Sequence, residues 1–133
     1  MMLAEVAIPD SAVALRKLRR SEINSSGRIR KQAFMPRAQG QDRDGLSVSI
    51  ETTELQEVHR VMFETDDHRA ARLKVLDIRE IELDVKADPD EQDRAHALIV
   101  GIPDRTMGII ELEKAERFAQ QLARLATPYS FAV

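Results

Sequence analysis

From Ile81 to Asp88, apolar and charged residues alternate one by one, and this pattern constrains the fold more than any other part of the chain. Successive side chains of a β-strand point to opposite faces of a sheet, so the alternation predicts a strand with one buried and one solvated face. The nearly continuous apolar run 95–101 is typical of a central strand covered on both faces. The acidic segment 88–93 between them contains Pro89, which cannot donate to a strand ladder, so we expect a solvated loop. The two strands should therefore lie side by side and form the platform of the fold.

The C-terminal part of the chain predicts an amphipathic helix over about 110–126, which would pack on this platform. Its apolar residues recur at spacings of three, four and seven, and charged and amide side chains fill the other face. The apolar positions are Leu112, Ala115, Phe118, Ala119, Leu122, Leu125 and Ala126. A second amphipathic helix is predicted over about 53–64, because Thr53 and Gln56 have capping-box spacing ahead of a helical apolar repeat.

Shorter patterns complete the expected architecture. Residues 45–50 alternate after a turn formed by Asp44 and Gly45 and predict a half-buried strand. Residues 13–19 fit a strand or the beginning of a helix, residues 72–77 fit a short strand, and alternating apolar residues from Tyr129 onward fit a terminal strand. These elements indicate an α+β fold, in which one small mixed sheet is packed by the two amphipathic helices in a single domain over residues 1–133.

Composition excludes several classes of protein and of site. The chain has 133 residues and no cysteine, which rules out disulfides, thiolate nucleophiles and cysteine-held metals. Its five glycines form no phosphate-binding spacing, and the aspartates around 84–93 lack the glycine and glutamate of a calcium loop, so we expect no cofactor and no metal. No apolar run is long enough to span a bilayer, and the start lacks the basic residues of a secretory signal. We therefore expect no membrane association and a cytoplasmic location.

Charge is distributed unevenly along the chain. Residues 16–43 hold nine basic and two acidic side chains, although the whole chain has a net charge of −3. Within this basic N-terminal segment, Arg28, Arg30 and Lys31 are candidates for contacting nucleic acid or another polyanion. A basic segment that folds back on the acidic remainder of the same chain explains the same counts.

Histidine chemistry offers a second candidate site. His96 lies near the start of the apolar run 95–101 and should be at the rim of the core, where it could act as a general base with an aspartate brought close in space. A histidine at such a rim could equally serve the fold through a hydrogen bond to the backbone.

Three short stretches resemble, in the same order, a pattern in small uncharacterised bacterial proteins. They are Gln32-Ala33-Phe34 with Arg37, then Asp44-Gly45-Leu46-Ser47-Val48, and then His96-Ala97-Leu98-Ile99-Val100-Gly101. The resemblance covers about residues 28–126, implies a compact α/β or α+β domain and brings no established activity. If the matching residues converge, Arg37, Asp44, Ser47 and His96 would form a polar cluster with Phe34 as an apolar wall, able to hold a small anionic or nucleotide-like ligand.

The main hypothesis from these patterns is a non-enzymatic binding or assembly module that docks on a protein partner or on another copy of itself. The segregated charge and the absence of a strong catalytic spacing support it. Two alternatives stay open. One is a small transferase or hydrolase that uses His96 with Asp44, and the other is a nucleic-acid-binding protein that uses segment 16–43.

Overall fold

The computed structural model describes residues 7–36, 45–51, 68–89, 91, 93–103 and 108–129. Its strands are β1 (Val13–Arg19), β2 (Leu46–Ile50), β3 (His68–Lys74), β4 (Asp84–Ala87), β5 (His96–Val100) and β6 (Thr127–Tyr129). Its helices are α2 (Val75–Glu80), the long helix α3 (Ile109–Leu125), and the short 3-10 helices η2 (Arg20–Glu22) and η3 (Lys31–Phe34). The predicted α+β class is therefore confirmed, whereas the helix predicted over about 53–64 lies outside the described residues.

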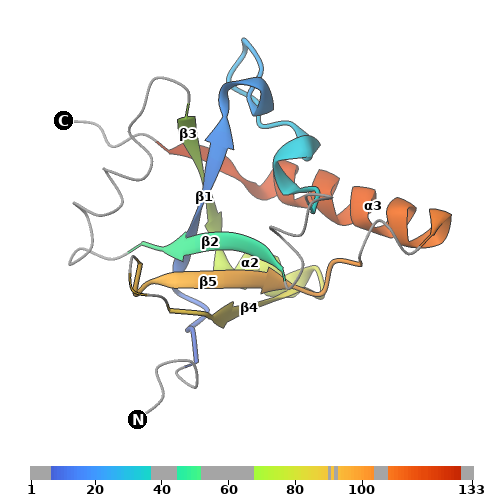
Figure 1. The fold of residues 1–133 in the computed structure, drawn as a ribbon. Helices are drawn as coiled ribbons and strands as arrows, with labels where there is room; N and C mark the ends of the chain where they lie inside the picture. The colour runs from blue at the N-terminus through green and yellow to red at the C-terminus, as the bar shows by residue number, and fades with distance from the viewer. Residues whose placement is uncertain are drawn as a thin grey trace.

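The described strands form one six-stranded sheet in the order β4-β5-β2-β1-β3-β6. Every neighbouring pair is antiparallel, so the expectation of a mixed sheet is wrong. Strand β1 pairs with β3 along its whole length but with β2 only at Ala14 and Leu15, after which β1 and β2 separate. As a result, the half made of β4, β5 and β2 crosses the half that contains β1 and β3 (Figure 1).

The platform expected from the alternating pattern is present. Strands β4 and β5 pair directly, with Val85 opposite Ile99, and both of these side chains point into the core. Strand β5 is internal in the sheet, but only its Ala97 and Ile99 are buried, and the alternate residues are half-buried. The expectation that both faces of β5 are fully covered was therefore too strong.

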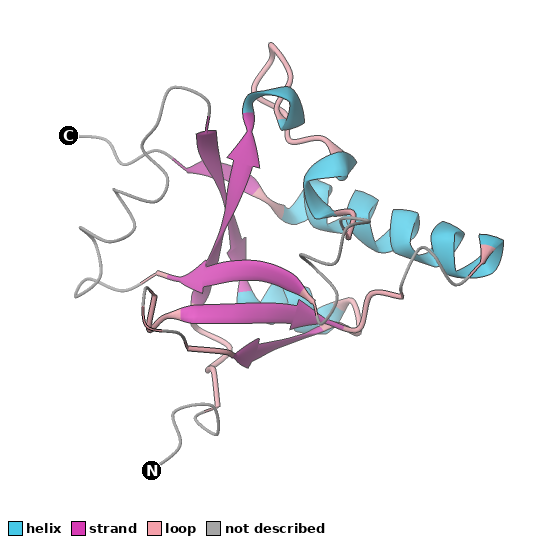
Figure 2. Cartoon of the chain, viewed as in Figure 1, coloured by secondary structure: helices cyan, strands magenta, loops and turns pink. Residues whose placement is uncertain are grey.

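Helix α3 lies on the core side of this sheet and projects beyond it at its N-terminal end (Figure 2). It buries a stripe of Ala115, Ala119 and Leu122, spaced four and three residues apart as an amphipathic helix requires. Two alanines in this stripe allow a close approach of α3 to η3, which is the element that α3 contacts most, rather than the β4–β5 platform on which the helix was expected to pack. The flanks of α3 on both sides of the stripe stay half-buried or exposed.

Segment 72–77 departs from the prediction of a short strand. Strand β3 begins earlier and ends at Lys74, and helix α2 follows at once with Val75 and Ile78 buried on one side. The loop after β4 also differs from expectation at Asp93, which is only 4% exposed. One oxygen of Asp93 accepts a hydrogen bond from the backbone N–H of Ala95 at 2.9 Å, which fixes the turn into β5.

Gly45 has a structural role at the beginning of β2. Its φ is +146°, and a Cβ at this position would lie 2.7 Å from the Ile99 carbonyl oxygen of the neighbouring strand. The predicted strand over 45–50 is thus confirmed as β2, and only glycine fits this entry against β5.

Candidate functional site

The loop over residues 23–30, which we call the arginine loop, lies between η2 and η3. Ile23 and Ile29 close its base with an antiparallel bridge. The side-chain oxygen of Asn24 accepts hydrogen bonds from the N–H of Ser26 at 3.0 Å and the N–H of Arg28 at 2.9 Å. Because one side chain holds the backbone at two points, the loop presents its arginines from a fixed framework.

The arginine loop forms one wall of a groove of about 560 Å³, which we call the basic groove. The opposite wall is the C-terminal half of α3, and the beginning of β6 completes it. Its lining residues are Gly27, Arg28, Ile29, Lys31, Gln120, Ala123, Arg124, Ala126 and Pro128. Residues from both ends of the chain therefore line one groove.

All charged residues that line the basic groove are cations. Arg28 from the loop and Arg124 from α3 are exposed, and neither makes an ion pair among the residues that the structure describes. Lys31 lies 3.6 Å from Glu116 of α3, with both side chains nearly half exposed. This exposed ion pair links η3 to α3 at the side of the groove and neutralises only part of its charge.

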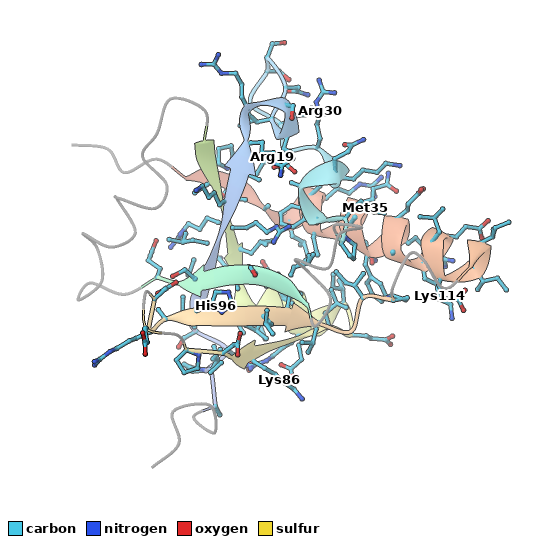
Figure 3. All side chains as sticks on the ribbon, viewed as in Figure 1. Arg19, Arg30, Met35, Lys86, His96 and Lys114 are labelled. Atoms are coloured by element: carbon cyan, nitrogen blue, oxygen red, sulfur yellow. The ribbon has the colours of Figure 1, made fainter. Side chains whose placement is uncertain are left out.

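Arg30, the third cation proposed from the sequence, is exposed but does not line the groove. Figure 3 shows it on the arginine loop, well separated from His96 on β5. Sequence reasoning missed Arg124, because only the docking of α3 brings this residue next to a segment about a hundred positions earlier. The sequence pattern places Arg124 on the exposed face of the amphipathic helix, but it does not show that this face lies opposite the arginine loop.

His96 has an aspartate partner, and that partner is Asp88. The Nδ1 atom of His96 lies 2.9 Å from the backbone oxygen of Asp88 and 3.2 Å from an oxygen of its carboxylate. Both neighbours accept hydrogen bonds, so this geometry requires the proton on Nδ1. The pairing follows from the β4–β5 hairpin, where the N–H of Asp88 also donates to the carbonyl of His96 at 2.8 Å.

The hydroxyl nearest to His96 in the sheet register is that of Ser49. Ser49 lies directly opposite His96 on β2, which places both side chains on the same face. Ser49 is only 1% exposed, however, and a substrate cannot reach a hydroxyl that is buried to this degree. The hydroxyl directly across from the oriented imidazole is therefore not available as a nucleophile.

The cluster suggested by the resemblance is only partly within the described residues. Ser47 and His96 lie on the same face of the sheet, two positions apart along β2. Phe34 is fully buried in the core on the other face, with Leu46 and Val48. Arg37 and Asp44 lie outside the described residues, so the convergence of the cluster stays a prediction.

Arg16 belongs to the basic segment but is 3% exposed, so it is not available to a ligand. Its Nε donates to the carbonyl of Ala33 at 2.8 Å, and its Nη1 donates to the carbonyl of Ser47 at 2.9 Å. These bonds join η3 to β2 where β1 and β2 separate. The guanidinium thus supplies donors where the strand ladder has ended.

A second arginine holds the turn between α2 and β4. The guanidinium of Arg79 donates to Asp10 at 2.6 Å and to Asp84 at 2.9 Å. The hydrogen bond from Arg79, together with one from the Val85 N–H, holds the pKa of Asp84 below its ordinary value. The hydrogen bonds to Asp10 and Asp84 raise the pKa of Arg79. This cluster fixes the position of residues 80–82.

Within the described ranges, no three histidine, aspartate or glutamate side chains are grouped so as to hold a metal ion. No helix in this part of the chain combines the length and apolar composition needed to cross a bilayer. Comparison of the chain with protein-family models, curated proteins and solved structures finds no match.

Proposed function

We propose that the protein is a non-enzymatic binding module that takes an acidic segment of a partner protein into the basic groove. The observation that carries this proposal is the lining of the groove, where Arg28, Lys31 and Arg124 are present and no described lining residue carries a carboxylate. A binding function does not depend on His96, whose directly opposite hydroxyl, that of Ser49, is buried.

Charge favours an anionic ligand at this position. Two of the three cations are arginines, and a guanidinium presents paired donors that match the two oxygens of a carboxylate. They come from the arginine loop and from a long helix, so little ordering of the backbone is required when a ligand binds. The side chains themselves are exposed, and their ordering is part of the cost of binding.

The rest of the lining favours a protein segment over nucleic acid. Ile29, Ala123, Ala126 and Pro128 provide apolar surface between the cations, which suits a segment that mixes acidic and apolar residues. None of the described residues that line the groove is aromatic, so these residues offer unpaired bases no ring on which to stack.

The proposal is tested with a fluorescently labelled acidic peptide, Glu-Leu-Glu-Glu-Leu-Glu, whose binding is followed by fluorescence anisotropy. Arg28→Ala and Arg124→Ala should each weaken binding about three- to fivefold, as expected for a partly exposed charge pair, and the effect should shrink in high salt. Arg94→Ala is the matched control, because Arg94 is exposed and does not line the groove.

Nucleic acid, the competing ligand, is tested in the same experiment. A single-stranded oligonucleotide of equal charge should bind more weakly than the peptide. Tighter binding of the oligonucleotide, lost in Arg28→Ala, would replace this proposal with nucleic-acid binding. If Arg28→Ala and Arg124→Ala bind the peptide as well as Arg94→Ala does, the basic groove is not the binding site.

A further inference from the structure

The other flank of α3 lines a second groove, which we call the mixed groove. It has a volume of about 640 Å³ and lies between α3 and the turn that joins α2 to β4. Ile81, Pro103 and Phe118 give it apolar surface. Its volume is within the range of sites that bind small molecules.

Opposite charges line the two walls of the mixed groove. Glu80 and Glu82 belong to the α2–β4 turn, and Lys114 and Arg117 belong to α3. Among the described residues, no ion pair within 4.0 Å joins one wall to the other. The two pairs of charges thus face a common space without neutralising each other by direct contact.

Glu82 has a backbone conformation that disfavours its own side chain. Its φ is +70°, in the left-handed region. The N–H of Glu82 donates to the carbonyl of Arg79, and the N–H of Leu83 donates to that of Ile78, which is the hydrogen-bond pattern of a Schellman motif. Glycine is the usual residue at this position of the motif, so glutamate is present here at a cost in stability.

We infer that the mixed groove binds a short zwitterionic peptide of two or three residues with apolar side chains. The ammonium group would lie between Glu80 and Glu82, and the carboxylate would meet Lys114 and Arg117. The apolar side chains would contact Phe118 and its apolar neighbours. A free amino acid carries both charges on one carbon, whereas the two walls require charges at opposite ends of the ligand. This inference is independent of the basic groove.

The probe for this inference is leucyl-leucine, with binding followed by isothermal titration calorimetry and by NMR chemical-shift changes. Acetylating its amino group or amidating its carboxylate should each weaken binding about tenfold or more, because each change leaves one wall without its charged partner. Saturable binding that is insensitive to both modifications would overturn the inference. So would the absence of binding at about 10 mM peptide.

Variants assign each wall to one end of the peptide. Glu82→Gln should weaken binding of leucyl-leucine but leave the remaining affinity for its acetylated form unchanged. Arg117→Gln should weaken binding of leucyl-leucine but leave the remaining affinity for its amide unchanged. Glu91→Gln is the control, since Glu91 is exposed and lies outside the groove. If Glu82→Gln and Arg117→Gln weaken all forms of the peptide equally, the walls do not recognise its ends.

The strained position allows a test that separates binding from folding. Glu82→Gly should raise the midpoint of thermal unfolding, because glycine adopts the left-handed conformation readily. The same variant should weaken binding of leucyl-leucine as much as Glu82→Gln does. A stabilised Glu82→Gly variant with unchanged affinity would contradict the inference.

Discussion

The two grooves share one helix, yet they differ in charge. Helix α3 contributes Gln120, Ala123 and Arg124 to the basic groove and Lys114, Arg117 and Phe118 to the mixed groove, so it is cationic on both flanks. The difference arises in the opposite walls. Arg28 of the arginine loop and Lys31 of η3 add cations to the basic groove. Glu80 at the end of α2 and Glu82 in the following turn add two carboxylates to the mixed groove.

The unevenly distributed charges of the sequence lie on different walls of the two grooves. The basic segment 16–43 contributes one wall of the basic groove, and the more acidic remainder of the chain contributes the acidic wall of the mixed groove. Helix α3 buries a single stripe and thus borders two grooves that differ in the charges of their lining residues. Charges from distant parts of the chain determine what each surface can bind.

The largest expected effect tests what supports the wall of the basic groove. Phe34 is fully buried and anchors η3, which carries Lys31 of this groove, to the core beneath α3. We expect Phe34→Ala to lower the free energy of unfolding by about 3–5 kcal/mol, as measured by urea denaturation, because it removes a large core side chain and leaves a cavity.

Phe34→Leu is the control for this prediction, and it should cost clearly less because most of the volume is kept. The folded Phe34→Leu variant should bind the acidic peptide more weakly than the unchanged protein does. Its affinity for leucyl-leucine should change less, since η3 does not line the mixed groove. If Phe34→Ala lowers the free energy of unfolding by less than about 1 kcal/mol, the ring does not belong to the core, and it could then form the apolar wall of a ligand site.

A smaller loss of stability is expected when Arg16 is substituted. This substitution tests whether a buried cation of the basic segment stabilises the fold, whereas an exposed one does not. Arg16→Met keeps the length of the side chain but removes the donors to the carbonyls of Ala33 and Ser47. We expect a loss of about 2–3 kcal/mol in the free energy of unfolding, because buried acceptors lose charged donors.

The exposed neighbour on the same strand provides the control, as Lys17→Met should change stability by less than about 0.5 kcal/mol. The folded fraction of Arg16→Met should bind the acidic peptide with unchanged affinity. Weaker binding by a fully folded Arg16→Met would place this residue among the ligand-binding cations.

The smallest expected effect is on the pH dependence of stability. It tests Asp84, whose ion pair with Arg79 holds the turn that forms the acidic wall of the mixed groove. Because Arg79 and the Val85 N–H hold the pKa of Asp84 below its ordinary value of 3.8, the folded state favours the charged carboxylate. This contribution is present above pH 3.8 and is lost as the pH falls through the lower folded-state pKa. Asp84 is half exposed, so solvent limits the effect to below about 1 kcal/mol.

Asp84→Asn should therefore lose a little stability at pH 7, and its unfolding free energy should fall less steeply under acid conditions than that of the unchanged protein. Urea denaturation at several pH values measures both. An identical acid dependence in the two proteins would show that this carboxylate does not contribute.

The elements with a strong pattern were predictable from sequence, and the weakly patterned ones were not. Alternation identified β4, although this strand begins at Asp84 and not at Ile81, because Ile81 and Glu82 form the turn that ends α2. The continuous apolar run identified β5, and helical spacing located α3 almost to the residue. Strand β3 has two adjacent alanines among basic residues, which gives no clear period of two, and α2 is only six residues long. Both depend on their neighbours in the sheet for their conformation.

The candidate site was predictable on one wall only. Arg28 and Lys31 were identified by charge, but Arg124 joins them through the packing of α3, which no local pattern contains. The partner of His96 could have been found, since a hairpin with Ala87 opposite Ala97 places residue 88 beside residue 96. The sequence reasoning considered Asp44 instead, because it treated the aspartate as a residue brought from elsewhere in the chain.

One consequence follows from Pro128 in β6. Among the described strands β6 lies at the edge of the sheet, is only three residues long and contains a residue without a backbone N–H. Such an edge resists the addition of a further strand, which protects the molecule from edge-to-edge aggregation. An incoming segment at the neighbouring basic groove would therefore be selected by its side chains, and variation in that segment would be tolerated wherever its charge spacing is kept.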